Sequence, residues 1–326
     1  MRAALVTAEG KAPVLGGLGI PVAAGNEQLI RVKAAAISNV VRARAAGTHY
    51  SSDNLFPFVA GVDGVGSLSN GQRVYFALPR PPHGSMADMT VTDPSLCVQV
   101  PDEVDDITAA AIVNPGMSSW MALTERAALK VGETVLINGA TGTSGRLAVQ
   151  IARYLGAGRI IATGRNASAL REVEMLGADV IILLDENAST HEFKLMQAFH
   201  DGIDIVIDYL WGPIAEFLLM AAARAGREAT PVRFVQVGSV SAPDITLPGS
   251  VLRSSAIHIM GSGHGSVPMP RLMDIASDVL RATIPAGLQI AYSPVPFSDF
   301  ERAWGCDDSR CRTVFIMDAG GAGDGY

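Results

Sequence analysis

The chain has 326 residues, of which 48% are hydrophobic and 17% are charged, and its formal net charge at pH 7 is −7. This composition suits two globular domains, argues against disorder and lacks the basic stripe by which proteins bind nucleic acid. No apolar run approaches the ~20 residues of a membrane helix, and three cysteines do not indicate a disulfide framework, so we expect a cytoplasmic protein without nucleic-acid or membrane partners.

The first third of the chain is rich in glycine and proline and contains short segments typical of β-strands. We predict strands over residues 3–7, 27–34, 72–77 and 89–91. They indicate an irregular, mostly antiparallel β domain. Apolar residues at helical spacing follow from Ile107 to Leu129, and we expect Pro115-Gly116 to interrupt this helix.

From Glu133 onward, predicted strands alternate with predicted helices. The strands cover residues 134–138, 159–163, 179–184, 203–208, 234–238 and 257–261, and the clearest helices cover residues 145–155 and 168–176. Such alternation is typical of a doubly wound parallel sheet with helices on both faces, so the predicted fold class is α/β. After Ser262 we expect a helix, a strand, a helix and a strand that return to the first domain, over residues 270–282, 289–295, 297–304 and 313–317.

The predicted strand 134–138 runs directly into a glycine-rich turn that opens a helix. The turn consists of Gly139, Ala140, Thr141, Gly142, Thr143, Ser144 and Gly145. In a dinucleotide-binding fold, Gly142 lets the main chain approach a pyrophosphate, Gly145 lets the helix pack closely on the strand, and the helix N-terminus attracts the phosphates. An ordinary turn is the alternative, but the strand, the helix and the later strand-helix units favour a dinucleotide site.

The residues after the second strand of this sheet indicate which dinucleotide binds. NAD sites usually place an acidic side chain about 20 positions after the turn, where it holds the ribose 2′-hydroxyl. Here Gly164, Arg165 and Asn166 follow the strand, and no acid is present. The planar guanidinium of Arg165 suits a 2′-phosphate, so the sequence predicts NADPH; a solvated loop arginine is the alternative.

The sequence resembles the medium-chain dehydrogenase/reductase superfamily, specifically its quinone oxidoreductase branch, over nearly its whole length. The segments that carry the resemblance are residues 61–66 (GVDGVG), 71–74 (GQRV), 130–137 (KVGETVLI), 139–145, 176–179 (LGAD) and 312–314 (RTV). The resemblance implies a GroES-like irregular β catalytic domain of residues 1–114 and 263–326, and a Rossmann NADPH-binding domain of residues 115–262. The family's usual assembly and the apolar strand 257–261 indicate a homodimer in which this edge strand pairs with its symmetry mate.

Zinc-dependent members of the superfamily hold their catalytic metal through three side chains. By motif, the corresponding positions here are Ser38, Val62 and Pro115. Valine and proline cannot bind zinc, and a catalytic zinc site needs three protein ligands, so we expect no metal. Without zinc, the favoured hydride acceptors are those whose product anion is delocalised, namely quinones and α,β-unsaturated carbonyls.

The resemblance also implies which residues of the first domain face the nicotinamide and the substrate. The branch carries an Asn-Pro-x-Asp step there, which this chain replaces, although Ser38 and Asn39 still offer polar groups. Ser38 is therefore a catalytic candidate and Asn39 a cofactor contact. The branch also has a substrate-facing tyrosine in a Gly-x-Tyr step, and His49 and Tyr50 compete for this position. The alternative is that both lie on a solvated loop.

Further cofactor contacts are implied in the second domain. Ser118 matches a Thr or Ser beside the nicotinamide, although a helix N-cap after Pro115-Gly116 is the alternative. Tyr209 and Trp211 follow a strand at the edge where open α/β sheets bind ligands, but aromatic packing is their commoner role. The nicotinamide ribose and carboxamide are implied to contact Gly238, Ser239, Met260, Gly261 and Ser262.

These observations predict a zinc-independent, NADPH-dependent reductase that transfers hydride to an apolar quinone or α,β-unsaturated carbonyl. One alternative is a zinc-free ketone or enoyl-thioester reductase of the same superfamily. Another is a non-catalytic NADPH-binding sensor or structural protein. A short-chain reductase fits less well, because a whole domain precedes the glycine-rich turn and no tyrosine has a lysine four positions on.

Overall fold

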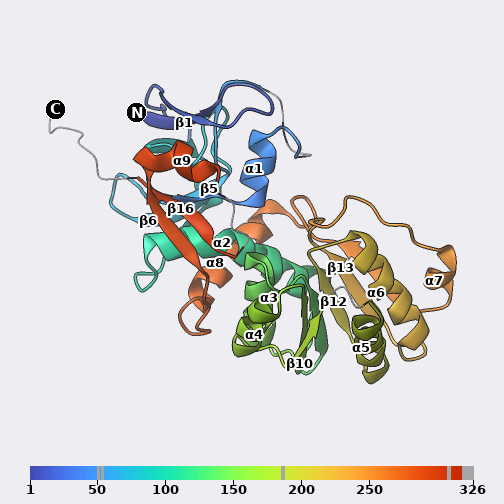
Figure 1. Cartoon of the computed structure of the whole chain (residues 1–326). Helices are drawn as coiled ribbons and strands as arrows, with labels where there is room; N and C mark the ends of the chain where they lie inside the picture. The colour runs from blue at the N-terminus through green and yellow to red at the C-terminus, as the bar shows by residue number, and fades with distance from the viewer. Residues whose placement is uncertain (50–51, 53–54, 185–187, 307–309, 318–326) are drawn as a thin grey trace. The chain divides into compact units, whose positions relative to one another are not determined.

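The computed structural model describes residues 1–49, 52, 55–184, 188–306 and 310–317, which form two compact units (Figure 1). The first unit comprises residues 1–114, 273–285 and 290–326, and the second comprises residues 115–272 and 286–289. Two helices, α2 (Asp106–Met121) and α8 (Met269–Ala282), each continue from one unit into the other. Among the residues described, no helix is long and apolar enough to cross a membrane.

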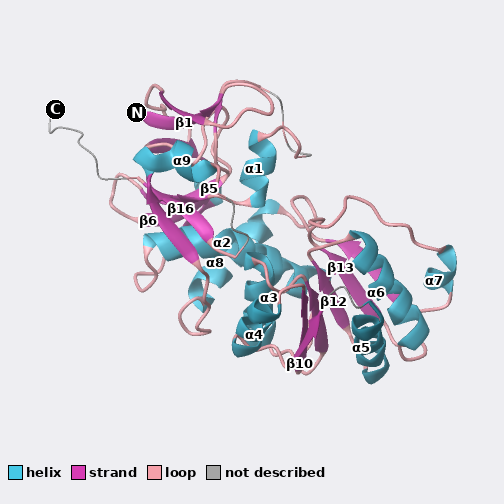
Figure 2. Cartoon of the chain, viewed as in Figure 1, coloured by secondary structure: helices cyan, strands magenta, loops and turns pink. Residues whose placement is uncertain are grey.

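The first unit contains two sheets, whose strands are shown in Figure 2. The smaller sheet has the order β2 (Val14–Gly17), β1 (Arg2–Val6) and β4 (Phe58–Val59). The larger sheet has the order β15 (Tyr292–Pro296), β16 (Arg312–Ile316), β3 (Gln28–Ala36), β5 (Asp63–Ser67), β6 (Arg73–Ala77) and β8 (Cys97–Gln99), and β7 (Met89–Thr92) also pairs with β3. Their pairings are antiparallel except for β15 with β16, as the irregular β domain predicted from the sequence requires.

The core of the first unit is built around aromatic side chains from its C-terminal segment. The rings of Phe300 and Phe315 lie 4.7 Å apart, and Phe297 lies edge-on to both of them. Phe297 belongs to a 3-10 turn (Phe297–Asp299) that leads into helix α9 (Phe300–Trp304). These rings pack against strands from the N-terminal part of the chain, so the last segment completes the core of the first unit.

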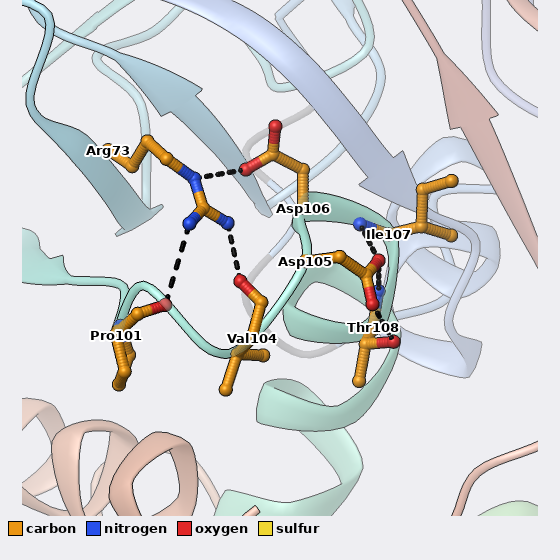
Figure 3. A network of polar contacts seen from close by, with 7 residues as sticks. All are labelled: Arg73, Pro101, Val104, Asp105, Asp106, Ile107 and Thr108. Atoms are coloured by element: carbon orange, nitrogen blue, oxygen red, sulfur yellow. Dashed lines mark hydrogen bonds and ion pairs between the residues drawn. The ribbon is translucent and has the colours of Figure 1, made fainter.

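The start of helix α2 is fixed by a network of polar contacts (Figure 3). The Asp105 carboxylate accepts hydrogen bonds from the backbone N–H groups of Ile107 and Thr108, at 3.0 and 2.9 Å. Arg73 on β6 donates to the Asp106 carboxylate at 2.8 Å and to the Val104 carbonyl at 2.5 Å. The capping carboxylate satisfies N–H groups that have no partner within the helix, so this network sets where α2 begins.

Our prediction that Pro115-Gly116 interrupts this helix is wrong. Helix α2 runs through Pro115 to Met121 and continues as a π-helical turn over Ala122–Arg126. Proline removes one backbone hydrogen bond, but residues 109–113, which precede it in the helix, are fully buried, and this burial outweighs the loss. The alternative for Ser118, a helix N-cap, is wrong for the same reason, because this residue lies inside α2.

The second unit contains one parallel sheet. Its strand order is β11 (Val180–Leu183), β10 (Arg159–Gly164), β9 (Thr134–Asn138), β12 (Ile205–Asp208), β13 (Val232–Gln236) and β14 (Ile257–Gly261). All neighbouring pairs are parallel. The chain starts at the centre with β9, moves outward to β11, and returns to add β12 on the other side, which is the strand order of the dinucleotide-binding fold. The predicted α/β fold class, with a Rossmann sheet in one unit and irregular β structure in the other, is confirmed.

Helices cover both faces of this sheet, and its strands are almost wholly apolar as a result. Helices α3 (Thr143–Tyr154) and α4 (Ala167–Met175) lie on one side, and α5 (Ala188–Asp201) and α6 (Gly212–Ala225) lie on the other (Figure 2). A short helix α7 (Gly249–Arg253) precedes β14. Leu218 and Leu219 of α6, Phe199 of α5, and Val206 and Phe234 of the sheet belong to one buried cluster.

Candidate functional site

The sequence-predicted cofactor residues of the second unit follow the carboxyl ends of its parallel strands. Residues 139–145 follow β9, residues 164–166 follow β10, residues 237–239 follow β13, and Gly261 and Ser262 end and follow β14. Because the strands are parallel, all these segments lie along one edge of the sheet. The strand order reverses between β9 and β12, and open α/β sheets bind ligands at such a switch point.

The glycine-rich turn has the close packing that was predicted for it. A Cβ atom on Gly145 would lie 2.4 Å from the Gly139 carbonyl oxygen, so any side chain there would force α3 away from the end of β9. Gly139 has a φ of +85°, a conformation that glycine adopts without strain. At Gly142, the N-cap of α3, a Cβ would make only an ordinary van der Waals contact, since the nearest atom is the Gly139 carbonyl oxygen at 3.9 Å. The backbone at Gly142 is therefore approachable.

Three buried polar side chains connect the strand ends behind this turn. Thr163 on β10 donates to the Asn138 side-chain oxygen at 2.7 Å, and its hydroxyl oxygen accepts the N–H of Gly139 at 3.3 Å. Asn138 on β9 in turn donates to Asp208 on β12 at 2.8 Å. All three side chains are fully buried, so this network ties the turn to three neighbouring strands.

Asp208 is also held by the backbone that follows its strand. Its carboxylate accepts hydrogen bonds from the N–H of Leu210 at 3.0 Å and from that of Trp211 at 3.1 Å. Burial raises the pKa of Asp208, and the hydrogen bonds from Leu210, Asn138 and Trp211 oppose this rise. The carboxylate thus orients the loop after β12, which was predicted to lie at the ligand-binding edge.

A second network anchors the first turn of α3. The Ser119 hydroxyl of α2 lies 3.1 Å from the Ser144 carbonyl oxygen and 2.8 Å from the Tyr209 hydroxyl. Arg146 donates to the Thr141 carbonyl at 3.1 Å and pairs with Glu172 of α4. Tyr209 therefore has a buried hydrogen-bond partner. We did not single out Ser119 or Arg146 from the sequence, because their contacts join segments far apart in the chain.

The loop after β10 presents the groups predicted to select NADPH. Asn166 is the N-cap of α4, and its side-chain oxygen accepts the N–H of Ala169 at 2.9 Å. Arg165 immediately precedes this cap and is exposed, and it makes no hydrogen bond or ion pair with any described residue. Gly164 packs so closely on Thr141 that a Cβ would lie 2.5 Å from its methyl carbon. Arg165 thus has its full set of donors available beside a helix N-terminus.

The remaining cofactor candidates of the second unit lie in differing environments. A Cβ on Gly238 would lie 2.7 Å from the Tyr209 carbonyl oxygen, so only glycine fits there, and Ser239 beyond it is exposed. The Gly261 carbonyl accepts a hydrogen bond from Arg126 at 2.8 Å. Its chain neighbour Met260 is half-buried, and its other neighbour, Ser262, is buried. Ser118 is half-buried within α2.

The candidates of the first unit lie at the start and end of helix α1 (Asn39–Ala45). Ser38 is its N-cap, and the Ser38 hydroxyl oxygen accepts the N–H of Val41 at 3.3 Å while its own hydrogen stays available to donate. Asn39 is exposed and His49 is half-buried. Tyr50 lies outside the described residues.

A buried charged cluster lies beside Val62, which the sequence resemblance matched to a metal-ligand position. Asp63 on β5 accepts hydrogen bonds from the Tyr75 hydroxyl at 3.1 Å and from Asn114 at 3.4 Å. Burial raises the pKa of Asp63 to about 6, opposed by the buried Arg312 guanidinium. In the part of the chain that the structure describes, no group of three or more His, Cys, Asp or Glu side chains is arranged to hold a metal.

Comparisons with known proteins agree with this geometry. A family model described as "Zinc-binding dehydrogenase" matches residues 145–280. The chain is 30% identical to the probable NADPH-dependent quinone reductase tdiC of Emericella nidulans, over 97% of this chain and 100% of that protein. It is 29% identical to the quinone oxidoreductase of Sus scrofa, over 59% of this chain and 60% of that protein.

Solved structures share the fold. The quinone oxidoreductase of Thermus thermophilus, described alone and in complex with NADPH, matches 97% of this chain and 100% of its own, with a TM-score of 0.80 and 23% identity. A mycobacterial quinone oxidoreductase gives a TM-score of 0.82 at 21% identity, over 97% of this chain and 100% of its own. At these identities the similarity establishes the architecture of the chain.

Proposed function

Because the chain belongs to the medium-chain dehydrogenase/reductase family, in its quinone oxidoreductase branch, we propose that it is an NADPH-dependent reductase of quinones and α,β-unsaturated carbonyls. The observation that carries the proposal is the glycine-rich turn at the switch point of the sheet, with Arg165 and no acid after the next strand. The names of similar proteins, a quinone reductase and a quinone oxidoreductase, support the activity. Nothing in these similarities favours a non-catalytic protein.

The second unit fits NADPH at two places. The open backbone at Gly142 and the N-terminus of α3 suit the pyrophosphate, because N–H groups and the helix dipole favour negative charge. Arg165 and the N-terminus of α4 suit the 2′-phosphate. Further contacts would come from Ser118, Gly238, Ser239, Met260, Gly261 and Ser262, and from Asn39 of the first unit. When bound, NADPH supplies the hydride.

The chain's own groups have two tasks in the reduction. Main-chain N–H groups hold the oxyanion that forms on the acceptor, and the Ser38 hydroxyl, whose hydrogen is available, adds one donor. A proton then reaches the product from His49, from Tyr50 or from water. The domain containing these residues is the catalytic one in this proposal, and the division into catalytic and cofactor domains stays a prediction.

The proposed reaction does not use zinc. Val62 and Pro115 stand at two of the three positions at which zinc-dependent members bind the metal, and neither side chain has a donor atom. Quinones and enones suit this chemistry because the product charge is spread over a conjugated system. A similarity to the trans-enoyl reductase pgmF of Aspergillus terreus, at 28% identity over 58% of this chain and 49% of that protein, favours enones as a second class of acceptor.

The assembly and location follow from the same proposal. A homodimer would pair β14 with its symmetry mate, because β14 is the last strand of the sheet and carries the exposed side chains of His258 and Ile259. A cytoplasmic location suits three cysteines that form no disulfide among the described residues.

The proposal is tested by following NADPH oxidation with a panel of quinones and a panel of enones, each assayed with and without EDTA. We expect turnover with at least one panel, unchanged by the chelator, and no stoichiometric zinc by elemental analysis. NADPH binding without turnover would instead establish a non-catalytic protein. Activity that EDTA abolishes and zinc restores would overturn the metal-free mechanism.

A further inference from the structure

The strand order of the second unit divides its ligand-binding edge into two halves. The order reverses between β9 and β12, and a dinucleotide bound at such a switch point lies across it, with one nucleotide over each half of the sheet. The glycine-rich turn follows β9, and Arg165 follows β10. In the proposed complex the adenosine with its 2′-phosphate therefore belongs over β9, β10 and β11, and the nicotinamide half belongs over β12, β13 and β14.

The segment after β14 is a closed turn over residues 262–266. Ser266 closes it, because its backbone N–H donates to the Gly263 carbonyl at 3.0 Å and its hydroxyl oxygen accepts the Gly263 N–H at 3.1 Å. The same hydroxyl donates to the Gly263 carbonyl at 2.8 Å. At the start of the turn, the Ser262 N–H donates to the Gln236 carbonyl at the end of β13, at 2.8 Å. The backbone of this turn is therefore fixed both within itself and to the neighbouring strand.

Arg126 contacts both ends of this turn. Its Nε donates to the Gly261 carbonyl at 2.8 Å, and its Nη1 makes a longer hydrogen bond to the Ser266 carbonyl at 3.5 Å. A guanidinium is a planar fork whose donors point in fixed directions, so a single arginine can bridge two carbonyls in one geometry. The preceding residue, Glu125, pairs with Arg271 at 2.9 Å and fixes the chain beyond the turn.

Arg126 reaches the turn from the end of a π-helical segment. Residues Ala122–Arg126 form the last turn of the helix that begins with α2, and the Ala127 N–H donates to the Ala122 carbonyl at 2.9 Å, five residues back. Such turns are rare and frequently occur at functional sites. The wider turn changes the direction of the side chains that follow it. Its last two side chains, those of Glu125 and Arg126, both contact the segment after β14.

The same turn carries a buried polar group that indicates a ligand or an ordered water. The Ser262 hydroxyl is buried and has no hydrogen-bond partner among the described residues. A buried hydroxyl without a partner is costly, and in native proteins such a group usually meets a water or a bound molecule. Ser262 directly follows β14 at the carboxyl edge of the sheet, which is the edge where open α/β sheets bind ligands.

We propose that Arg126 is a positioning residue for the nicotinamide half of NADPH and acts through the turn that it clamps, residues 261–266. This role rests on the proposed function, in which NADPH is the cofactor. Without the guanidinium, the two ends of the turn are no longer joined, and the nicotinamide half loses a fixed backbone against which to bind. The adenosine half lies over the other strands and does not depend on this clamp.

The test compares NADPH with 2′,5′-ADP, which contains the adenosine and the 2′-phosphate but no nicotinamide. Arg126→Met removes the donors and keeps an unbranched side chain. We expect the dissociation constant of NADPH, measured by calorimetric titration, to rise roughly three- to tenfold, and that of 2′,5′-ADP to stay within about twofold of the parent value. Arg126→Lys keeps the charge but not the fork, so its NADPH affinity should lie between those of the parent and Arg126→Met.

Arg153→Met is the matched control. Arg153 also donates to two backbone carbonyls, those of Ala157 and Gly177, at 3.1 and 2.9 Å. These residues precede β10 and β11, so they lie at the amino ends of the strands, away from the ligand-binding edge. The control should have a lower thermal unfolding midpoint and parent affinity for both ligands. A lower midpoint in Arg126→Met, with NADPH and 2′,5′-ADP weakened alike, would show a merely structural role and overturn the inference.

Ser266→Ala weakens the turn from within, because it removes the hydroxyl that bonds Gly263. Its NADPH affinity should fall while its 2′,5′-ADP affinity stays at the parent value. If Arg126→Met does not fold, Ser266→Ala and Arg126→Lys decide the matter. An unchanged ratio of the two dissociation constants in both variants would overturn the inference.

Failure of the proposed function has a different signature. A selective loss of NADPH affinity in Arg126→Met, with no oxidation of NADPH by any quinone or enone in the parent, would refute the reductase and leave the role of Arg126 supported. Oxidation of NADPH by a quinone, with the affinities for NADPH and 2′,5′-ADP unchanged in Arg126→Met, would overturn the role of Arg126 while the reductase stands. A parent protein that does not bind NADPH would overturn both.

Discussion

Charge and hydrogen bonding at single residues control how the second unit meets its cofactor. Arg165 is exposed and unpartnered among the described residues, while Thr163, only two positions earlier, is fully buried and makes two hydrogen bonds. In the proposal, the first residue meets the 2′-phosphate, and the second holds the turn that the pyrophosphate approaches. Substitutions at these two positions should therefore affect cofactor binding through different physical terms.

Arg165→Ala should weaken NADPH binding about 10- to 100-fold and leave NADH binding nearly unchanged. The reason is the loss of one or two charge-assisted hydrogen bonds to the 2′-phosphate, each worth about 1.5–3 kcal/mol, of which even one accounts for this range. Fluorescence titration with each cofactor measures the effect. Arg171→Ala, on the exposed side of α4, is the matched control and should bind both cofactors as the parent does. Equal affinity of the parent for NADPH and NADH would rule out the assigned role of Arg165.

Thr163→Val keeps the shape of the side chain but removes both hydrogen bonds of the hydroxyl group. The Gly139 N–H and the Asn138 side-chain oxygen then lose a buried partner, so the free energy of unfolding should fall by about 1–3 kcal/mol. NADPH affinity should fall as well, because the turn loses an anchor. Thr163→Ser retains the hydroxyl and serves as the control for both measurements, made by urea unfolding and fluorescence titration. Parent-like NADPH affinity in Thr163→Val would show that the network does not position the turn.

Asp63 should make the protein less stable as the pH rises from about 4 to about 6. Burial raises its pKa in the folded chain to about 6, above the ordinary 3.8, so within this interval the folded state binds more protons than the unfolded state. Stability is lost as the pH rises through the folded pKa, by up to roughly 3 kcal/mol. Asp63→Asn should lack this decline. The substitution also takes a charge partner from Arg312. This changes the free energy of unfolding of the variant by a similar amount at every pH, so it does not restore the decline with pH. Unfolding curves at several pH values measure both proteins, and an identical slope in the two would contradict the assignment.

At the scale of helices and strands, hydrophobic pattern located most elements of the second unit. The strands Thr134–Asn138 and Ile257–Gly261 were predicted with the bounds that the structure has, because apolar runs between turn signals leave little freedom. Helix α1 and strand β5 were not predicted. The first is short, and the second contains two glycines in five residues, so neither has a strong periodic pattern. For helix α2 the error was of the opposite kind. Pro115 was expected to interrupt the helix, but the burial of the residues before it keeps the helix continuous.

Some residues of the candidate site could likewise be predicted from the sequence, and others could not. Gly142, Gly145 and Arg165 were identified from the sequence because a strand, a turn and a helix are adjacent in the chain. The partnership of Asn138 with Asp208 joins residues 70 positions apart, and no local pattern indicates it.

Strand β14 should mediate dimerisation, since an apolar edge strand is stabilised by pairing its free backbone groups. Light scattering at micromolar concentration should give about twice the 34.1 kDa of one chain. Ile259→Lys places a charge on an exposed position of this strand and should shift the mass toward one chain. Phe193→Lys, an exposed apolar position on α5, is the control and should stay dimeric. A monomeric parent protein would refute the pairing.

At the scale of the whole molecule, the two units carry complementary parts of the proposed chemistry. In the proposal, the second unit contributes the glycine-rich turn and Arg165, and the first contributes Ser38 and His49. In the proposed reaction, N–H and O–H donors polarise the acceptor. Such donors suffice for acceptors that delocalise the product charge, so we expect quinones and enones to be better acceptors than simple ketones.

The central claim is that the protein transfers a hydride from NADPH to a quinone, and a single-turnover reaction without oxygen tests it most directly. Parent protein saturated with NADPH is mixed with 1,4-naphthoquinone in the presence of EDTA, and the loss of NADPH absorbance is compared with the hydroquinone formed. We predict one hydroquinone for each NADPH oxidised, with no semiquinone signal. NADPH that stays reduced with quinones and enones alike, together with efficient oxidation of a simple alcohol by NADP, would contradict the account.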